Sequence, residues 1–182
     1  MKKSTKNLCQ GAVLVAMALA LSYLKIPVGA VWGSFGGSID FVMVPLIIFA
    51  VKAGWGWGIG AGFIFGLLKF FFAGGAVLNW VSLLLDYSIA YGAVGLAGLA
   101  KGSKWELMTG AVIGCLERFG VHFVSGITVY AQYMPETFMD MTMLNTFHYS
   151  LLYNGTYMLP NTVIAVAACA LLAKPMKRFL QK

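Results

Sequence analysis

The chain has 182 residues, of which 60% are apolar and 10% are charged, and its formal net charge is +7. A soluble globular chain is about 45–50% apolar and about 25% charged. Thirteen basic and six acidic side chains are too few to cover the surface of a soluble domain of this size. The composition excludes a soluble enzyme, a disordered tail and a nucleic-acid-binding domain. It predicts an all-α integral membrane protein.

The first predicted span covers about residues 7–24 and ends at Lys25. A membrane helix needs about 20 mostly apolar residues. The basic start followed by an apolar run also fits a secretory signal peptide, but the rest of the chain is equally apolar, which favours a span. Residues 28–39 come next, are rich in glycine and contain Trp32 and Phe35. We predict that this segment is a loop that forms an extracellular lid.

Five further spans are predicted, at about residues 40–53, 55–72, 77–100, 105–133 and 145–172. The first of these five is short, so it requires a thinner bilayer or neighbours that bury its ends. The last is expected to end at Lys174 and Pro175. The chain is therefore expected to form one six-helix membrane domain over residues 1–182.

The positions of the basic residues predict the orientation of these spans. Six spans place both termini on one side of the membrane. Ten of the thirteen basic residues lie on that side: Lys2, Lys3, Lys6, Lys52, Lys101, Lys104, Lys174, Lys177, Arg178 and Lys182. The positive-inside rule makes this side cytoplasmic. The three cysteines form no CxxC pair, so neither a disulfide framework nor a metal site is expected.

Two spans carry small residues at every fourth position. The residues are Ala12, Ala16 and Ala20 on the first span, and Gly58, Gly62 and Gly66 on the third. Such stripes let helix backbones approach closely in lipid, where hydrophobicity does not drive helix association. We interpret the glycine stripe as internal packing. The alanine stripe fits either internal packing or a docking face for another membrane protein.

Ionisable residues inside the spans predict a polar cavity or mutual pairing. Each costs roughly 2.5–3.5 kcal/mol at the centre of a membrane helix. The chain has six at or near this depth: Lys69, Asp86, Glu117, Arg118, His122 and His148. Lys69 is interpreted as extending outward past residues 70–72, because a long lysine stem can carry its charge to the interface. Glu117 is expected to point about 100° away from Arg118 on its helix.

Three of the predicted helices have a polar, aromatic-rich face toward the outer half of the bundle. These faces contain Asn79, Ser82, Asp86, Tyr87 and Tyr91, then Arg118, His122, Ser125 and Tyr130, and finally Tyr149, Tyr153, Asn154, Tyr157 and Asn161. Aromatic walls with a few hydrogen-bonding groups are typical of small-molecule sites. Structural roles remain open as alternatives. Asp86 and Arg118 can form a structural ion pair, and His122 can make an interhelical hydrogen bond. Tyr133 can belong to a belt of aromatic residues at the membrane interface.

No catalytic motif is present. The sequence has no GxSxG, no Walker phosphate loop and no HExxH. The chain is therefore not expected to be an enzyme, and ATP-driven transport would need a partner that hydrolyses ATP.

Several of these residues form motifs of a known family. The alanine stripe is similar to the motif that docks substrate-binding subunits onto their partner. Asp86 and Tyr87 stand where the family more often has Glu-Tyr. HFVSG, from His122 to Gly126, resembles the family's HFxxG, and YSLLYNG, from Tyr149 to Gly155, resembles YSxxxNG. On these motifs the chain resembles, over nearly its whole length, the thiamine-specific S-component of energy-coupling factor (ECF) vitamin transporters.

The resemblance implies a set of functional residues and partners. The implied substrate-binding residues are Asp86, Tyr87, His122, Tyr130, Tyr149 and Asn154, together with Asp40 and either Trp32 or Phe35. The implied docking residues are Ala12, Ala16 and Ala20. The implied partners are thiamine, a transmembrane coupling subunit and two ATPase subunits that use the ATP, and no cofactor is implied. The implied location is the bacterial cytoplasmic membrane.

The chemistry of thiamine independently suits these residues. Its thiazolium cation needs an anion or π-faces in a low-dielectric pocket, and Asp86 or Asp40 can supply the anion. Asn154 and a carboxylate can satisfy the aminopyrimidine, whose polar atoms would otherwise be buried unpaired. Three alternatives remain: an S-component for another vitamin or a thiamine precursor, a secondary transporter driven by protons through Asp86 and His122, and a membrane enzyme that acts on lipids.

Overall fold

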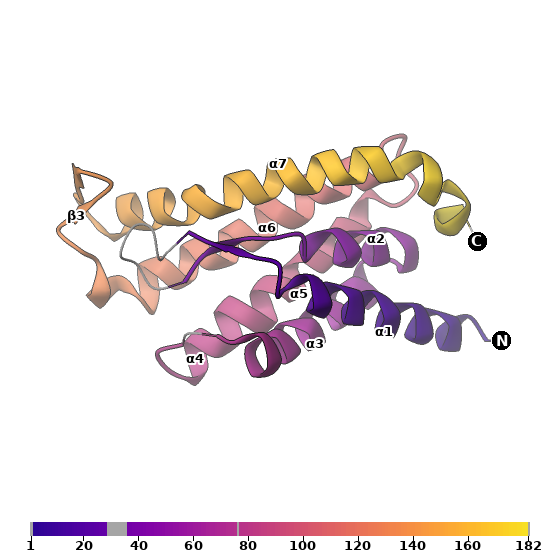
Figure 1. Ribbon diagram of the computed structural model, residues 1–182, viewed down its shortest axis with the longest axis horizontal. Helices are drawn as coiled ribbons and strands as arrows, with labels where there is room; N and C mark the ends of the chain where they lie inside the picture. The colour runs from indigo at the N-terminus through magenta and orange to yellow at the C-terminus, as the bar shows by residue number, and fades with distance from the viewer. Residues whose placement is uncertain (1, 29–35, 76, 182) are drawn as a thin grey trace.

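The computed structural model describes residues 2–28, 36–75 and 77–181, and most of these residues are helical. The long elements are α1 (Lys3–Leu21), α3 (Trp55–Ala73), a composite helix from Trp80 to Ala100, α6 (Glu106–Thr128) and α7 (Thr146–Gln181). The composite helix consists of α4 (Trp80–Leu83), η1 (Leu84–Ile89), α5 (Ala90–Val94) and η2 (Gly95–Ala100). The helices form an elongated bundle with both termini at the same end (Figure 1).

Five of these helices are long and apolar enough to cross a membrane, and with the short helix α2 (Met43–Ala53) they make the six helices expected from the sequence. The observed bounds differ from the predicted ones mainly at the ends. The first helix begins and ends a few residues earlier than predicted. The predicted fifth span ends as a helix at Thr128 and continues into a separate short turn, η3 (Ala131–Tyr133).

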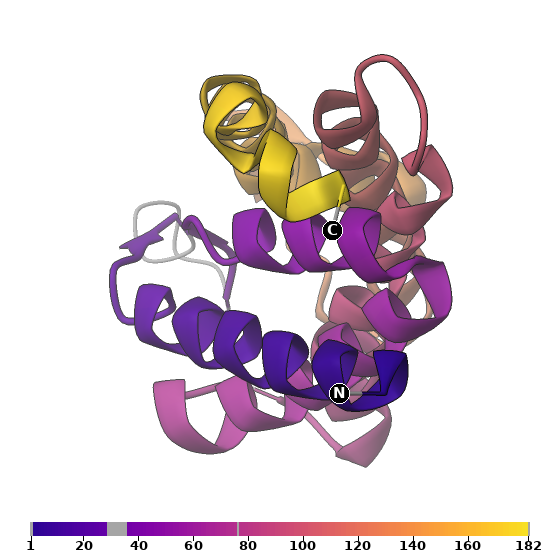
Figure 2. The same cartoon turned by 90° about the vertical axis from the view of Figure 1, so that its right-hand side faces the viewer.

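Helix α2 is the short second span of the prediction. Its 11 residues extend about 16 Å, roughly half of the hydrocarbon thickness of about 30 Å. All residues from Val42 to Lys52 are buried. A helix that is apolar all round is stable inside a bundle, and α2 contacts α1, α3, α6 and α7. Figure 2 shows it between α1 and α7. Neighbouring helices therefore bury its ends, which is one of the two solutions expected from the sequence.

Helix α7 extends past the predicted end at Lys174 and Pro175, so this predicted boundary was wrong. The helix continues to Gln181 although Pro160 and Pro175 lie inside it. Proline removes one backbone hydrogen bond and favours a kink rather than an obligatory end. The last turns remain helical because Met176, Phe179 and Leu180 pack against the core. Lys52 also donates a hydrogen bond from Nζ to the Leu180 carbonyl at 3.3 Å.

The glycine stripe on α3 lies inside the bundle, as predicted. A Cβ atom at Gly62 would collide with the Tyr91 backbone, and one at Gly66 would collide with the Tyr87 backbone. A Cβ atom at Gly58 would lie 2.8 Å from the Gly95 carbonyl oxygen. The absence of side chains along this face lets the composite helix lie directly against α3. This contact determines the positions of Tyr87 and Tyr91.

The alanine stripe on α1 has the opposite environment. Ala12, Ala16 and Ala20 are exposed, whereas the other face of the helix buries Gly11 and Val15. At Gly11 a Cβ atom would lie 2.8 Å from the Phe49 ring of α2. The alanine face therefore does not contribute to internal packing.

Two short hairpins lie at the end of the bundle opposite the termini. Strand β1 (Ile26–Pro27) pairs antiparallel with β2 (Ser38–Ile39), and β3 (Thr137–Phe138) pairs with β4 (Met141–Thr142). Asn161 of α7 fixes the first hairpin, because its Nδ2 donates to the Ser38 carbonyl at 2.7 Å. The predicted lid residues Trp32 and Phe35 lie outside the described part of the chain.

Candidate binding site

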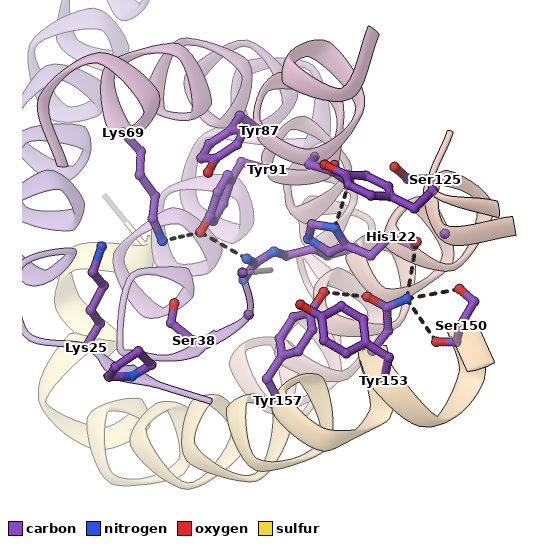
Figure 3. Close-up of a pocket in the computed structure, with 18 of the residues that line it drawn as sticks. Lys25, Ser38, Lys69, Tyr87, Tyr91, His122, Ser125, Ser150, Tyr153 and Tyr157 are labelled. Atoms are coloured by element: carbon purple, nitrogen blue, oxygen red, sulfur yellow. Dashed lines mark hydrogen bonds and ion pairs between the residues drawn. The ribbon is translucent and has the colours of Figure 1, made fainter. Parts of the chain in front are cut away.

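A cavity of about 470 Å³ lies between the β1/β2 hairpin, α3, the composite helix, α6 and α7 (Figure 3). Drug-sized ligands are usually bound in pockets of about 300–1,000 Å³. Six of the lining residues are those implied by the family motifs: Asp86, Tyr87, His122, Tyr130, Tyr149 and Asn154. The lining also includes Lys25, Lys69, Tyr91, Arg118, Ser125, Tyr133, Ser150, Tyr153 and Tyr157. Residues that are far apart in the sequence therefore meet in one cavity.

A π-helical segment, η1, places Asp86 and Tyr87 side by side at the cavity. A π-helical turn is wider than an α-helical turn and is frequent at functional sites. Asn79 and Ser82, which were expected on the same helical face as Asp86, are not among the residues that line the cavity. These two residues instead form a capping box at the start of α4, where the Ser82 backbone N–H donates to Asn79 Oδ1 at 3.0 Å.

Asp86 contacts His122 of α6, with 3.2 Å between Asp86 Oδ1 and His122 Nδ1. A carboxylate only accepts hydrogen bonds, so this contact places a proton on Nδ1. The sequence left two roles open for His122, an interhelical hydrogen bond and a place in the binding site. In the structure His122 contacts Asp86 of the composite helix and also lines the cavity. Asp86 does not form the alternative ion pair with Arg118. The Arg118 guanidinium instead donates a hydrogen bond to the Tyr91 hydroxyl at 3.0 Å.

Tyr130 lies just beyond the end of α6 and near Asp86. Burial, reinforced by the Asp86 carboxylate, raises the pKa of the Tyr130 hydroxyl. The hydroxyl therefore stays protonated and can donate a hydrogen bond. Tyr133, expected in an interfacial belt, is half-exposed but also lines the cavity.

Helix α7 supplies an aromatic wall built on a four-residue spacing. Tyr149 and Tyr153 stack with 5.7 Å between ring centroids, and Tyr153 meets Tyr157 edge-on at 5.8 Å. Phe138 of β3 packs against the first two rings. A row of π-faces can stabilise a cation or stack against a flat ring.

Asn154 joins α6 to α7 behind this wall. Its Nδ2 donates to the carbonyl oxygens of Ser150, at 2.9 Å, and His122, at 3.3 Å. Its Oδ1 accepts from the Tyr157 hydroxyl at 2.5 Å. Asn154 is therefore a structural cross-link as well as a lining residue, and both ends of its amide are engaged within the protein.

The most buried part of the cavity contains Lys69, Tyr91 and Arg118, which we call the cationic end. Lys69 is 6% exposed, and its ammonium pairs with Asp40 at 3.0 Å and donates to the Tyr91 hydroxyl at 2.5 Å. The prediction that Lys69 extends outward was therefore wrong. An internal carboxylate and a phenol oxygen replace the solvent that the ammonium would otherwise need.

Asp40 does not line the cavity. Its carboxylate accepts hydrogen bonds from Lys69, from the Ser38 hydroxyl at 3.2 Å and from the Val42 backbone N–H at 3.2 Å. The side chain has no exposed surface. The carboxylate is therefore held by groups of the protein itself. Trp32 and Phe35, the remaining implied binding residues, lie outside the described residues.

The cavity is also lined by residues that the set implied by the family motifs does not include. Arg118 and Ser125 share the α6 face of His122, so their spacing was a usable signal. Tyr153 and Tyr157 follow from Tyr149 by steps of four residues. The inward direction of Lys69 had no local signal, because its partner Asp40 is 29 residues away. Glu117 is exposed, as its angle from Arg118 predicted.

The fold and the cavity define a multi-pass membrane protein with an aromatic, hydrogen-bonding pocket for a small molecule. Within the described ranges, no three His, Cys, Asp or Glu side chains are grouped to hold a metal ion. Residues 8–181 match the family described as "Thiamine transporter protein", and the chain belongs to that family. The family resemblance found in the sequence is therefore confirmed. Membership in a transporter family also confirms a role in transport rather than catalysis.

Two curated relatives have the same name. The thiamine transporter ThiT of Bacillus subtilis is 27% identical over 197 residues, which cover 98% of this chain and 96% of that protein. ThiT of Lacticaseibacillus paracasei is 27% identical over 177 residues, covering 88% of this chain and 83% of that protein. These relatives and the apolar helices indicate a multi-pass protein of the bacterial plasma membrane.

A solved structure confirms the fold. The ThiT structure from Listeria monocytogenes superposes with a TM-score of 0.81 and covers 98% of this chain and 99% of that one, at 20% identity. At this identity the likeness concerns the fold alone. It supports the six-helix arrangement that was predicted from hydropathy.

Proposed function

We propose that this chain binds thiamine in the cavity described above and acts as the S-component of an ECF-type transporter. The observation that carries the proposal is the meeting of six motif residues, separated by up to 68 positions in the sequence, around a single cavity. Both termini lie at the opposite end of the bundle from the two hairpins (Figure 1). With the termini in the cytoplasm, the cavity would receive its ligand from outside the cell.

The chemistry of the cavity supports a cationic aromatic ligand. Asp86 has 16% of its side chain exposed, and its carboxylate pairs with His122 at 3.2 Å. It can therefore still face the thiazolium. The stacked rings of Tyr149 and Tyr153 offer π-faces for the same cation. The Tyr130 hydroxyl and the second acceptor site of Asn154 Oδ1 add hydrogen-bonding groups for the aminopyrimidine.

The exposed alanine stripe supports docking to a membrane partner. Ala12, Ala16 and Ala20 form a flat strip on α1 that no other described helix covers. Small residues allow a partner helix to approach closely, and close packing is a main source of helix association in lipid. A coupling subunit that also carries two ATPase subunits is the partner implied by the family motifs. ATP would be used by those subunits.

Binding is tested by calorimetric titration of the purified chain with thiamine, in parallel with other vitamins and with the thiamine precursor hydroxymethylpyrimidine. The proposal expects saturable binding of thiamine that the other compounds do not displace. Tighter binding of another compound would reassign the substrate.

Docking is tested with Ala16→Trp, compared with Met17→Trp as a matched control. Met17 is exposed on a neighbouring face of the same helix. Ala16→Trp is expected to leave thiamine affinity intact but to abolish co-purification with the coupling subunits and thiamine uptake, since the bulky side chain prevents close helix contact. Uptake by the isolated chain in liposomes, driven by a proton gradient, would instead show a secondary transporter.

A further inference from the structure

The hydroxyl of Ser125, on α6, is buried at the cavity and is not used by the protein. Ser125 is 1% exposed and lines the cavity. Among the described residues, its Oγ has no hydrogen-bond partner. Buried polar groups are normally hydrogen-bonded, and one that is not calls for an explanation. The cavity supplies an explanation, because a ligand inside it would meet this hydroxyl.

Two other helical hydroxyls show how such a group is usually satisfied. The hydroxyls of Thr128 and Thr162 each donate to the backbone carbonyl four residues earlier, at 2.6 Å and 2.7 Å. This bond is a common solution for Ser and Thr inside a helix. Within the described chain the Ser125 hydroxyl forms no such bond. The Ser125 backbone is nevertheless held in place, because its carbonyl accepts from the N–H groups of Val129 at 2.9 Å and Tyr130 at 3.2 Å.

His122 offers a second unpartnered group one helical turn before Ser125. Both residues project from α6 and line the cavity (Figure 3). His122 Nδ1 faces the Asp86 carboxylate at 3.2 Å, so Nε2 is the acceptor of the neutral ring. This Nε2 atom is also buried without a partner among the described residues. Neighbouring positions of α6 therefore present an acceptor and a hydroxyl that can donate.

An aminopyrimidine carries the complementary pair of groups. Its amino group donates hydrogen bonds, and the ring nitrogen next to the carbon that bears the amino group accepts them. A ligand with both groups can satisfy His122 Nε2 and Ser125 Oγ together. A ligand without the ring nitrogen would leave the Ser125 hydroxyl buried and unpaired. Sites built to hydrogen-bond a ligand reject analogues in this way.

We propose that Ser125 is a specificity-determining residue whose hydroxyl donates a hydrogen bond to the ring nitrogen next to the amino group of the thiamine aminopyrimidine. The inference rests on the proposed function, because it requires thiamine in the cavity. It goes beyond that function by assigning a ligand contact to a residue outside the six motif residues, and by naming the ligand atom that this residue recognises.

The experiment compares purified full-length wild-type protein with Ser125→Ala and measures their affinities for two ligands. One ligand is thiamine, and the other is the thiamine analogue in which CH replaces that ring nitrogen. Ser125→Ala is expected to lower thiamine affinity about two- to tenfold, the effect of one hydrogen bond, and to leave analogue affinity unchanged. Wild-type protein is expected to prefer thiamine to the analogue by at least the same factor.

Ser88→Ala is the matched control for this variant. Ser88 is also buried, and its Oγ also lacks a partner among the described residues, but it is not one of the described residues that line the cavity. Its replacement should leave thiamine affinity unchanged. The unfolding temperature without ligand then separates a ligand contact from a structural role. Ser125→Ala should unfold at the wild-type temperature or above, because the change removes an unpaired buried hydroxyl and alanine favours a helix.

Several outcomes would overturn the assignment. Unchanged thiamine affinity in Ser125→Ala would do so, as would an equal loss for thiamine and the analogue or an equal loss in Ser88→Ala. A lower unfolding temperature of ligand-free Ser125→Ala, or its failure to fold, would show a structural role instead. Equal binding of the two ligands by wild-type protein would mean that the ring nitrogen contributes nothing. Failure of wild-type protein to bind thiamine at all would instead reject the proposed function.

Discussion

Asp40 and Asp86 were both candidates for the carboxylate that faces a cation, yet their surroundings differ. Asp40 lies between β2 and α2, accepts hydrogen bonds from Lys69, Ser38 and the Val42 backbone, and has no exposed side-chain surface. Asp86 lies on η1, lines the cavity and contacts His122 at 3.2 Å. A carboxylate that the protein itself saturates with donors stabilises the fold. A carboxylate at a cavity wall with unused acceptor capacity is available to a ligand.

The largest effect is expected from Asp40→Asn. The change leaves the buried Lys69 ammonium without its counter-charge, and breaking a buried pair in this way costs about 3–5 kcal/mol. We expect a lower unfolding temperature in detergent. Asp140→Asn, which changes an exposed loop carboxylate, is the control and should have no effect.

Adding Lys69→Met to Asp40→Asn tests the reason for that loss. Removing the unpaired ammonium should restore part of the stability, so the double variant should be more stable than the Asp40→Asn variant. Equal or lower stability of the double variant would contradict the proposed division between the two carboxylates.

Asp86→Asn is expected to leave the fold intact and to weaken thiamine binding. Truncating one partner of a buried charge pair costs about 2–5 kcal/mol, which is roughly 30- to several-thousand-fold in affinity. The measurement is the thiamine dissociation constant, together with the unfolding temperature as a control for folding. An unchanged dissociation constant would remove Asp86 from the site. Poor folding of the variant would show that Asp86 resembles Asp40 more than the structure indicates.

A smaller effect is expected from Tyr130→Phe. The hydroxyl stays protonated because burial and then the nearby Asp86 raise its pKa, and its removal deletes one hydrogen-bond donor while the ring remains. One such bond contributes about 0.5–1.5 kcal/mol, so thiamine affinity should fall a few-fold. Combining the change with Asp86→Asn should give a non-additive result, because neighbouring residues couple. Full additivity would mean that Tyr130 and Asp86 act separately.

Much of the fold and of the candidate site followed from local patterns. Hydropathy located the spans because a membrane helix requires a long apolar run. Helical spacing placed Arg118, His122 and Ser125 on one face, and all three line the cavity. Helical spacing alone did not place Asn79 and Ser82 correctly. They form a capping box at the start of α4 and do not line the cavity.

Distant contacts decided the remaining features. The direction of Lys69 depends on Asp40, and the extension of α7 past Pro175 depends on the core that receives Phe179 and Leu180. Neither partner is adjacent in the sequence, so no pattern within either segment indicated the result. The binding roles of the residues around the cavity remain predictions, whereas their placement around it is a property of the structure.

The two small-residue stripes separate what the sequence determined from what the tertiary structure decided. The sequence alone determined that Ala12, Ala16 and Ala20 share one face of a helix, and that Gly58, Gly62 and Gly66 share another, because residues four apart lie on the same side. Only the tertiary structure decided that the glycines meet the composite helix and that the alanines stay exposed. Periodicity defines a face, but the helix that covers it is a distant segment, and its position follows from the packing of the whole bundle.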